Sequence, residues 1–233
     1  MKHRTDEIAD RIASEVRIRV QRSLEALNFS VPLPGFLERI EKLAATLVIW
    51  GSRMNLTARP GDPAEMAFHI VDSLMPLILA DCAPALREAL APQRRVIDLG
   101  SGAGFPGLVL AAASDAVFTL CESRRKRASF LSVAAAEMDL KNVAIKPIRA
   151  TPESFREFDL VVARAVGDLQ QLYRIAAPAL RTGGLVLLYA SQAQRLDLKH
   201  AASAGLMGYT RLDYGMDRGD EQVARMLAFW RKR

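Results

Sequence analysis

The sequence contains little cysteine, little histidine and no long apolar run. Two cysteines, Cys82 and Cys121, lie far apart and outside any metal-ligand spacing, and the three histidines form no ligand pattern. We therefore expect two reduced, buried thiols and no metal site. No stretch approaches the roughly 18 apolar residues of a membrane helix, and no apolar segment follows the N-terminus as in a secretory signal. These absences predict a cytoplasmic protein that does not contact a membrane.

The remaining composition is that of a folded, basic protein. The chain has 233 residues, of which half are hydrophobic, which is enough for one domain with an extension. Lysine and arginine outnumber aspartate and glutamate by 32 to 26, giving a net charge of +6. Basic residues cluster at positions 94–95, 124–127 and 231–233. This balance permits nucleic-acid binding without proving it.

The first 90 residues predict helices and no strand. Over the first 27 residues, apolar side chains recur every three or four positions, as in an amphipathic helix: Ile8, Ile12, Val16, Val20, Leu24 and Leu27. The segment from Val31 to Gly35 interrupts this pattern. A second helix is expected from Phe36 to about Trp50, and a third from Ala64 to about Ala80. We therefore interpret residues 1–90 as a helical N-terminal extension.

From Arg95 onward, short apolar strands alternate with helices. Strands are expected at residues 95–99, 117–121, 143–148, 158–163 and 185–190, and helices at 107–113, 124–138 and up to about residue 180. Gly183 and Gly184 are expected to end the last of these helices, as glycines after a helix do. The tail predicts two strands, 208–214 and 222–230, joined by a polar turn at 216–221.

This alternation predicts a mostly parallel sheet covered by helices on both faces. The short connection between the last two strands makes that pair antiparallel. Together these features describe an α/β, Rossmann-like domain over residues 91–233, with the seven-stranded type of sheet found in class I S-adenosylmethionine-dependent methyltransferases.

A glycine-rich turn follows the first expected strand. Residues 96–107 read V-I-D-L-G-S-G-A-G-F-P-G, with glycines at Gly100, Gly102 and Gly104. Glycines at these positions let the backbone turn tightly and approach a ligand without a Cβ in the way. We predict that all three bind S-adenosylmethionine.

Two acidic residues bear on the choice of cofactor. Asp98 precedes the glycines and can accept hydrogen bonds, directly or through water, from a cationic amino-acid group, whereas it would repel a pyrophosphate. Glu122 closes the second strand, where an acid can bind both ribose hydroxyls. Dehydrogenases place an acid there too, and Gly102, Gly104 and Gly107 also fit their G-x-G-x-x-G pattern. We favour S-adenosylmethionine, with a nicotinamide-dependent oxidoreductase as the alternative.

The residues after the fourth expected strand argue against two methyl-transfer chemistries. Methylation of an exocyclic adenine amine usually uses an Asn/Asp-Pro-Pro-aromatic loop, and residues 163–166 read Ala-Arg-Ala-Val instead. Methylation of C5 of a pyrimidine needs a thiolate, and neither cysteine is suitably placed. Guanine N7 has a free lone pair and no proton to lose, so positioning alone can contribute up to roughly 7–11 kcal/mol. This permits guanine N7 without singling it out.

Six short motifs follow one another over roughly residues 36 to 190. They are Trp50 with Asn55-Leu56-Thr57; His69-Ile70 with Asp72-Ser73-Leu74; the turn at 96–107; Glu122-Ser123 with Lys126-Arg127 and Phe130-Leu131; Arg149; and Ala163-Arg164-Ala165. In this order and spacing they resemble the bacterial ribosomal small-subunit methyltransferase G family, also called glucose-inhibited division protein B.

The resemblance implies methyl transfer from S-adenosylmethionine to N7 of one guanine in small-subunit ribosomal RNA, free or in an assembling subunit. By position, it implies that Gly100, Phe105, Ala150, Thr151 and Arg164 contact the cofactor. Arg164 would lie where the cofactor and the target base meet, as a catalytic positioning residue. The alternative for this arginine is a surface ion pair. We expect the protein to act as a monomer.

A second set of residues is predicted to bind RNA. Its members lie on the helical extension and at the start of the helix after the second strand: Asn55, His69, Arg124, Arg125, Lys126 and Arg127. Cations at a helix N-terminus oppose the helix dipole, so we favour phosphate contact over a solvated face for the basic run. The alternative for His69 and Asp72 is that they are core polar groups of the extension. For Asn55, the alternative is that its side chain only stabilises a turn.

One departure from the family concerns the fifth strand. The family usually follows this strand with a Lys-Gly pair, and this chain has Tyr189-Ala190-Ser191. A cationic RNA contact is therefore missing there or supplied elsewhere. This keeps two alternatives open: a methyltransferase of the same fold that acts on another acceptor, and a non-catalytic RNA-binding relative.

Overall fold

The computed structural model describes residues 2–30, 33–51 and 54–233. Val31 and Pro32 of the interruption predicted at Val31–Gly35 lie outside the described residues, and Leu33 to Gly35 lie between two helices, as predicted. The helices are α1 (Lys2–Ala26), α2 (Phe36–Gly51), α3 (Pro63–Ile78), α4 (Pro84–Ala89), α5 (Gly107–Ala113), α6 (Arg125–Glu137), α7 (Leu169–Ala179) and α8 (Leu198–Ser203). The strands are β1 (Arg95–Leu99), β2 (Val117–Cys121), β3 (Val143–Lys146), β4 (Phe158–Arg164), β5 (Leu180–Ser191), β6 (Leu206–Arg218) and β7 (Glu221–Lys232).

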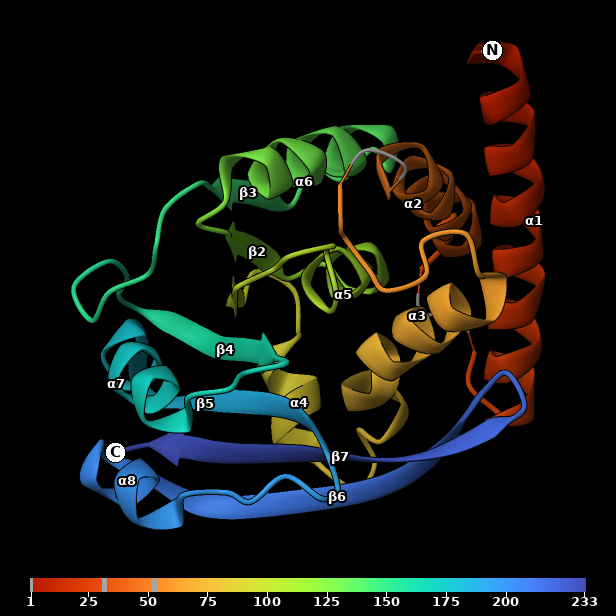
Figure 1. Cartoon of the computed structure of the whole chain (residues 1–233). Helices are drawn as coiled ribbons and strands as arrows, with labels where there is room; N and C mark the ends of the chain where they lie inside the picture. The colour runs from red at the N-terminus through yellow and green to blue at the C-terminus, as the bar shows by residue number, and fades with distance from the viewer. Residues whose placement is uncertain (1, 31–32, 52–53) are drawn as a thin grey trace.

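The strands form one seven-stranded sheet in the order β3-β2-β1-β4-β5-β7-β6 (Figure 1). Strands β1 to β5 are parallel, and β7 is antiparallel to both β5 and β6. This arrangement confirms the predicted fold class, including the antiparallel final pair. Because β1 is a parallel neighbour of both β2 and β4, the carboxyl ends of these three strands meet at one edge of the sheet.

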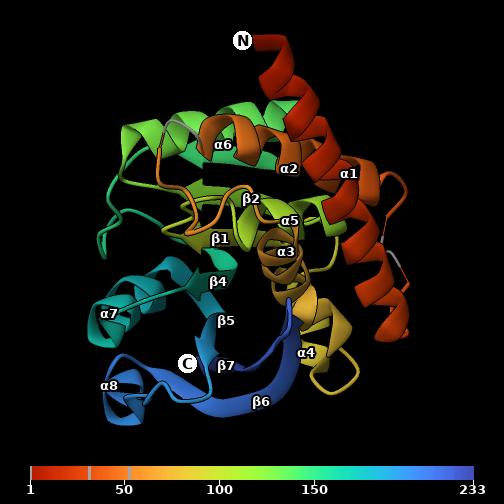
Figure 2. The ribbon, with the colours of Figure 1, turned by 45° about the vertical axis from the view of Figure 1, so that its right-hand side comes forward.

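Both faces of the sheet are buried, as the apolar strands predict. Alternate residues along β1 point to opposite sides, so that Val96 packs with α5 and α6 and Ile97 with α7 and α8. The same alternation separates Leu160 from Val161 in β4. Helices α1, α2 and α3 pack outside the α5–α6 layer and belong to the same hydrophobic core (Figure 2).

The buried stripe of α1 differs from the predicted one at both ends. Val16, Val20 and Leu24 are buried as predicted, but the stripe continues through Ala13 and Ala9. Ile8 is 41% exposed and Leu27 is 42% exposed. Each residue turns about 100° around a helix axis, so Ile8 faces away from the core when Ala9 faces it. The prediction for these two end residues was therefore wrong.

The glycines before the fifth strand do not end a helix, so that prediction was wrong. Helix α7 ends at Ala179, and Gly183 and Gly184 lie inside β5. They accompany an irregularity in the pairing of β4 with β5, between Phe158 and Leu160. A Cβ on Gly184 would lie 2.9 Å from the carbonyl oxygen of Phe158, so the close approach of the two strands requires glycine here.

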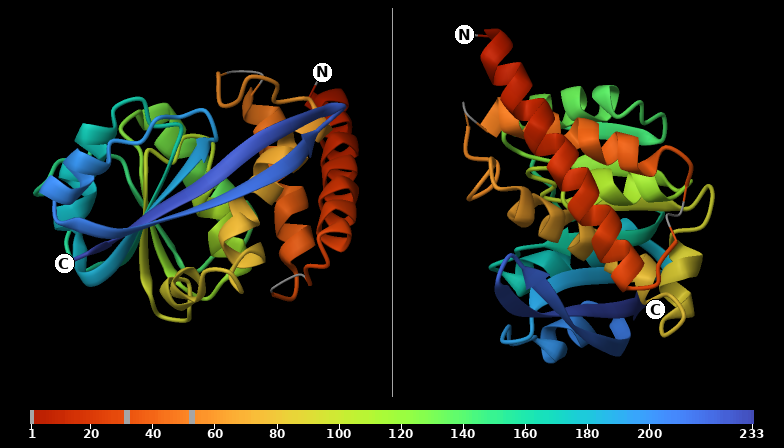
Figure 3. Two further views of the ribbon diagram at one scale, coloured as in Figure 1. Left: turned by 90° about the horizontal axis from the view of Figure 1, so that it is seen from below. Right: turned by 90° about the vertical axis from the view of Figure 1, so that its right-hand side faces the viewer.

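The final hairpin is much longer than predicted. Strands β6 and β7 contain 13 and 12 residues and run through the expected turn, leaving only Gly219 and Asp220 between them. The hairpin extends beyond the ends of the other strands and reaches α1 and α3 (Figure 3).

The short helices α4 and α8 were not predicted. Among the described residues, no helix has the length and apolar character needed to span a membrane.

One cysteine differs from the expectation. Cys121 is buried at the end of β2, but Cys82 is exposed, because it lies in the turn between α3 and α4.

Within the described ranges, no group of three or more histidine, cysteine or acidic residues is arranged to bind a metal.

Candidate cofactor cleft and an adjoining ion-pair network

The glycine turn connects β1 to α5 in a backbone conformation that other residues rarely adopt. The φ angles are +80° at Gly100, +54° at Gly102 and +87° at Gly104. A Cβ on Gly100 would meet nothing within 4 Å, so this position borders open space. A Cβ on Gly104 would lie 2.5 Å from Leu108, where the turn packs against its own helix. The turn therefore depends on its glycines for both backbone conformation and space.

Glu122 ties this turn to the start of α6. Its side chain is buried, and its two oxygens accept hydrogen bonds from the backbone N–H groups of Gly102, at 3.0 Å, and Arg124, at 2.8 Å. A carboxylate has about four lone-pair sites, so each oxygen can accept one more hydrogen bond. Glu122 is thus fixed at the carboxyl edge of the sheet and can still bind hydroxyl groups.

Asp98 lies beneath the turn and not on the wall of a cleft. It is 1% exposed, and its Oδ2 accepts a hydrogen bond from the backbone N–H of Gly107 at 3.1 Å. Burial raises the pKa of Asp98 to about 7, against the opposing effect of hydrogen bonds that include that of Gly107. The side chain therefore supports the turn from the core side.

A cleft of about 310 Å³ opens at the carboxyl edge of β1 and β2. Two of the residues predicted to contact the cofactor, Gly100 and Ala150, line it. The others lie outside its lining: Asp98, Gly102, Gly104, Phe105, Glu122, Thr151 and Arg164. Thr151 is exposed just beyond Ala150, and its Oγ1 lies 3.0 Å from Oγ of Ser154. The other lining residues were not predicted: Leu99, Cys121, Ser123, Ile148, Arg149, Val166, Gly167, Asp168, Gln171, Leu172 and Ile175. Many of them follow a strand end, which is where open parallel sheets bind ligands, so this signal could have identified them.

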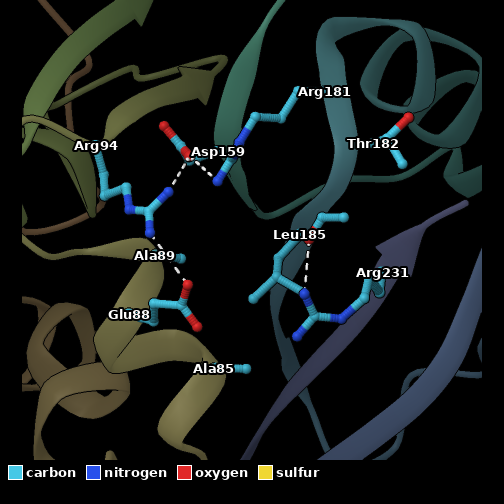
Figure 4. A pocket seen from close by; sticks show the side chains of 10 residues that line it. Ala85, Glu88, Ala89, Arg94, Asp159, Arg181, Thr182, Leu185 and Arg231 are labelled. Carbon is cyan, nitrogen blue, oxygen red and sulfur yellow. Dashed lines mark hydrogen bonds and ion pairs between the residues drawn. The ribbon is translucent and has the colours of Figure 1, made fainter.

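A second hollow lies at the amino ends of the parallel strands, among α4, β5 and the end of β7 (Figure 4). Arg94 and Arg181 both contact Oδ1 of Asp159, at 3.0 and 2.6 Å, and Arg231 donates to the carbonyl oxygen of Gly183. Arg94 also contacts Glu88 of α4 at 3.1 Å, so the ion pairs at this hollow join α4, β4 and β5.

Arg164, at the end of β4, contacts two residues of α3. Its Nη1 lies 3.3 Å from Oδ2 of Asp72, and its Nη2 lies 2.6 Å from Nδ1 of His69. The arginine side chain is 13% exposed and the Asp72 side chain 0%. The alternative of a surface ion pair was therefore wrong, because this pair is buried.

The long hairpin completes an ion-pair network with α3. Arg225 contacts both oxygens of Asp72, at 3.1 and 3.2 Å, and the hydroxyl of Tyr214 donates to Oδ1 of Asp72 at 2.7 Å. Arg218 contacts both oxygens of Glu65, at 2.6 and 2.7 Å. Sequence reasoning missed these four partners. Glu65 could have been predicted, because it lies four residues before His69 on the same helix face. Tyr214 and Arg225 could not, because only the pairing of β6 with β7 places them opposite each other.

His69 connects this network to the glycine turn. Its Nε2 lies 3.2 Å from Oε1 of Glu65, and its ring lies 5.3 Å from that of Phe105. Burial and the neighbouring Arg164 lower the pKa of His69 to about 4, so the ring is neutral at pH 7. Because Nδ1 accepts from Arg164, the proton resides on Nε2 and is donated to Glu65. These contacts are those of a buried polar group, and RNA contact by His69 stays a prediction.

The basic run lies at the start of α6, next to the loop that contains Asn55. Arg124, Arg125 and Lys126 are exposed, and no carboxylate of the described chain lies within ion-pair distance of them. Arg127 is half-buried and donates from Nη2 to the carbonyl oxygen of Asn55 at 3.0 Å. The structure thus brings together two regions that were predicted separately to bind RNA.

Tyr189 occupies the position near the family's usual Lys-Gly pair. Its side chain is buried, and its hydroxyl donates to the carbonyl oxygen of Ser73 at 2.9 Å, so it joins β5 to α3. We expect Tyr189→Phe to lower the free energy of unfolding by about 1 kcal/mol, the usual contribution of one such hydrogen bond. Urea denaturation measures this difference. Tyr209→Phe, which alters a 38% exposed tyrosine, is the control and should unfold like the unmodified protein.

The fold is shared with solved methyltransferases. A S-adenosylmethionine-dependent O-methyltransferase from Thermotoga maritima superposes with a TM-score of 0.52 at 17% identity, over 70% of this chain and 65% of that one. A tRNA methyltransferase from Aquifex aeolicus gives a TM-score of 0.52 at 17% identity, over 66% and 69%. At this level of identity the likeness shows the fold alone.

Two sequence relatives are each named ribosomal RNA small subunit methyltransferase G. The protein from Acidiphilium cryptum is 39% identical over 185 residues, which cover 77% of this chain and 80% of the relative. The protein from an Anaeromyxobacter species is 35% identical over 224 residues, which cover 92% and 96%. The family described as rRNA small subunit methyltransferase G matches residues 36–211. This match spans the glycine turn, the cleft and α3, and the chain therefore belongs to the rRNA small subunit methyltransferase G family.

Proposed function

We propose that this chain transfers a methyl group from S-adenosylmethionine to N7 of a guanine in small-subunit ribosomal RNA, free or in an assembling subunit. The observation that carries the proposal is the family match, which includes every motif around the cleft. The names of the two relatives support the RNA substrate. N7 has no proton to remove, which suits a site where His69, with its pKa lowered to about 4, is a weak base. We further propose that the protein acts as a monomer in the cytoplasm.

The residues at the cleft suit this cofactor. When bound, S-adenosylmethionine supplies a methyl group on a positively charged sulfur. Gly100 offers an open backbone position, Glu122 offers carboxylate oxygens for the ribose, and Ala150 lies on the wall. We propose as cofactor contacts residues of the turn, of the ends of β2 and β4, and of the loop after β3: Gly100, Gly102, Gly104, Phe105, Glu122, Ala150, Thr151 and Arg164. Asp98 would act through the turn above it.

Arg164 is proposed to position the reacting groups. It is held on one side by Asp72 and on the other by His69, whose ring contacts Phe105 of the turn. A side chain fixed by two neighbours loses little conformational entropy when a substrate binds, which favours a productive orientation. The network therefore couples the helical extension, which we propose as residues 1–90, to the methyltransferase domain, proposed as residues 91–233.

We expect Glu122→Ala to weaken binding of S-adenosylmethionine by about 10- to 100-fold. Hydrogen bonds to a charged group contribute about 1.5–3 kcal/mol, and each 1.4 kcal/mol is a factor of ten. Isothermal titration calorimetry measures the change. Glu137→Ala, which removes an exposed acid from the last turn of α6, is the control and should bind like the unmodified protein. Equal affinity in both variants would remove Glu122 from the site.

The proposed function is tested with small ribosomal subunits from a strain that lacks this gene. The subunits are incubated with the protein and methyl-labelled S-adenosylmethionine, and the rRNA is digested to nucleosides. We expect label in 7-methylguanosine. Label in another nucleoside would leave the fold assignment unchanged and would reject guanine N7 as the acceptor atom. No label, with cofactor still bound, would indicate another acceptor or a non-catalytic RNA-binding protein.

A further inference from the structure

A second cavity lies outside the cofactor cleft, between the end of α2 and the first turns of α6. Its volume is about 370 Å³, at the lower end of the range for small-ligand pockets, and none of its lining residues lines the cofactor cleft. It is lined by Ile49, Trp50, Met54, Lys126 and Ser129. We refer to these five residues as the Trp50 pocket.

The aromatic side chain of this pocket is held in a fixed orientation. The Trp50 ring packs edge-to-face against the buried ring of Phe130, with centroids 6.0 Å apart and an angle of 66° between the planes. The tryptophan itself is only half-buried. An aromatic ring that is fixed on one side and accessible on another is the kind of surface on which unpaired nucleobases stack. Met54 adds a polarizable apolar wall beside it.

The pocket has one positively charged residue in its lining, Lys126, which is exposed. Arg124 and Arg125 are exposed on the two preceding residues, and none of the three has a carboxylate within ion-pair distance in the described part of the chain. A stacked base brings its own phosphate, which needs a cation close to the aromatic ring. An acidic peptide would satisfy the cations but leave no reason for an aromatic cavity between them. The combination favours single-stranded RNA.

The pocket is also tied to the proposed active site. The backbone N–H of Arg124 donates to Glu122, and Glu122 accepts in turn from Gly102 of the glycine turn. Arg127, one residue after Lys126, donates to the backbone of Asn55. Ser123 lines the cofactor cleft and Lys126, three residues later, lines the pocket, so one continuous strand of RNA can reach the pocket from the cleft by crossing the start of α6.

We propose that the Trp50 pocket binds one unpaired base of the substrate RNA, other than the base that receives the methyl group, with Lys126 on the adjacent phosphate. This inference rests on the proposed function. It assigns the pocket to substrate affinity and not to the methyl-transfer step.

Tryptophan fluorescence tests the stacking directly. The only other tryptophan, Trp230, is 1% exposed, so quenching by a ligand reports on Trp50. We expect a short single-stranded oligoribonucleotide to quench the emission, and a fully abasic oligomer of the same length to leave it unchanged. Trp50→Phe should abolish the quenching, and Lys126→Ala should weaken binding of the oligoribonucleotide. No quenching by the base-bearing oligomer, or equal quenching by the abasic oligomer or by an acidic peptide, would overturn the proposal.

Kinetics provide a second test. Trp50→Ala should raise the KM for small subunits about tenfold, since stacking contributes about 1–3 kcal/mol per base, while kcat and cofactor affinity stay unchanged. Trp50→Phe keeps an aromatic ring against Phe130 and should restore most of the affinity. An unchanged KM in a folded Trp50→Ala protein would overturn the proposal. If subunits accept no methyl group at all, the proposed function fails, and the fluorescence titration still decides whether the pocket binds a base.

Discussion

Asp72→Ala is expected to lower the free energy of unfolding by about 3–5 kcal/mol and to abolish methyl transfer. Asp72 is fully buried and contacts Arg164, Arg225 and the hydroxyl of Tyr214. Removing one partner of a buried ion pair leaves the other charge without compensation, which costs far more than the pair contributed. Here two guanidinium groups would lose their carboxylate at once. Since domains are stable by only about 5–15 kcal/mol, this is a large fraction of the total.

Thermal and urea unfolding measure this effect, together with methylation of small subunits below the melting temperature. Asp213→Ala is a matched control, because Asp213 precedes Tyr214 on β6 but pairs with Arg211 at the surface, with a side chain 48% exposed. Exposed pairs contribute about 0–1 kcal/mol, so this variant should unfold almost like the unmodified protein. If the two aspartate variants proved equally stable, the network would not join α3 to the hairpin in the way we describe.

Gly104→Ala is expected to lower the free energy of unfolding by about 2–5 kcal/mol and to remove measurable cofactor binding. At φ +87°, an L-residue costs roughly 1–2 kcal/mol, and the added Cβ would lie 2.5 Å from Leu108. Overpacking of this kind adds about 1–3 kcal/mol. Because the clash involves the branch point of Leu108 as well as its end, the turn must move to relieve it. That movement would displace Gly102 from Glu122.

The control is Gly205→Ala, between α8 and β6. Its φ of +81° carries the same backbone cost, but a Cβ there would meet nothing within 4 Å. This variant should lose about 1–2 kcal/mol and keep its affinity for S-adenosylmethionine, measured by titration calorimetry. Unimpaired cofactor binding by Gly104→Ala would mean that the turn does not hold the cofactor.

Helix α3 contacts both the end of β4 and the glycine turn. Its Asp72 and His69 hold Arg164 at the end of β4, and His69 contacts Phe105 of the glycine turn. The pKa of His69 is lowered to about 4, chiefly by burial, so this contact involves a neutral ring at pH 7. An extension that merely covered the sheet would need apolar residues at these positions.

Much of the fold follows from local sequence patterns. The strands β1, β2 and β4 are short apolar runs between turns, and the glycine turn follows the first of them, so their order and type could be predicted from residue spacing. The cleft-lining residues Gly100 and Ala150 follow from the same logic, because each lies in a loop that follows a parallel strand. In these segments, local propensity and tertiary structure agree.

The rest depended on contacts between distant segments. The length of the final hairpin could not be read from its sequence, because a polar residue such as Arg218 continues β6 where α3 offers Glu65 as a partner. Gly184 is required because β4 approaches β5 too closely for a Cβ at this position. Ile8 is exposed because α1 turns another face toward the core. The sequence by itself determined the sheet, the glycine turn and the family. The tertiary structure alone decided which charges are buried together, because a buried carboxylate is stable only where cations from other segments meet it.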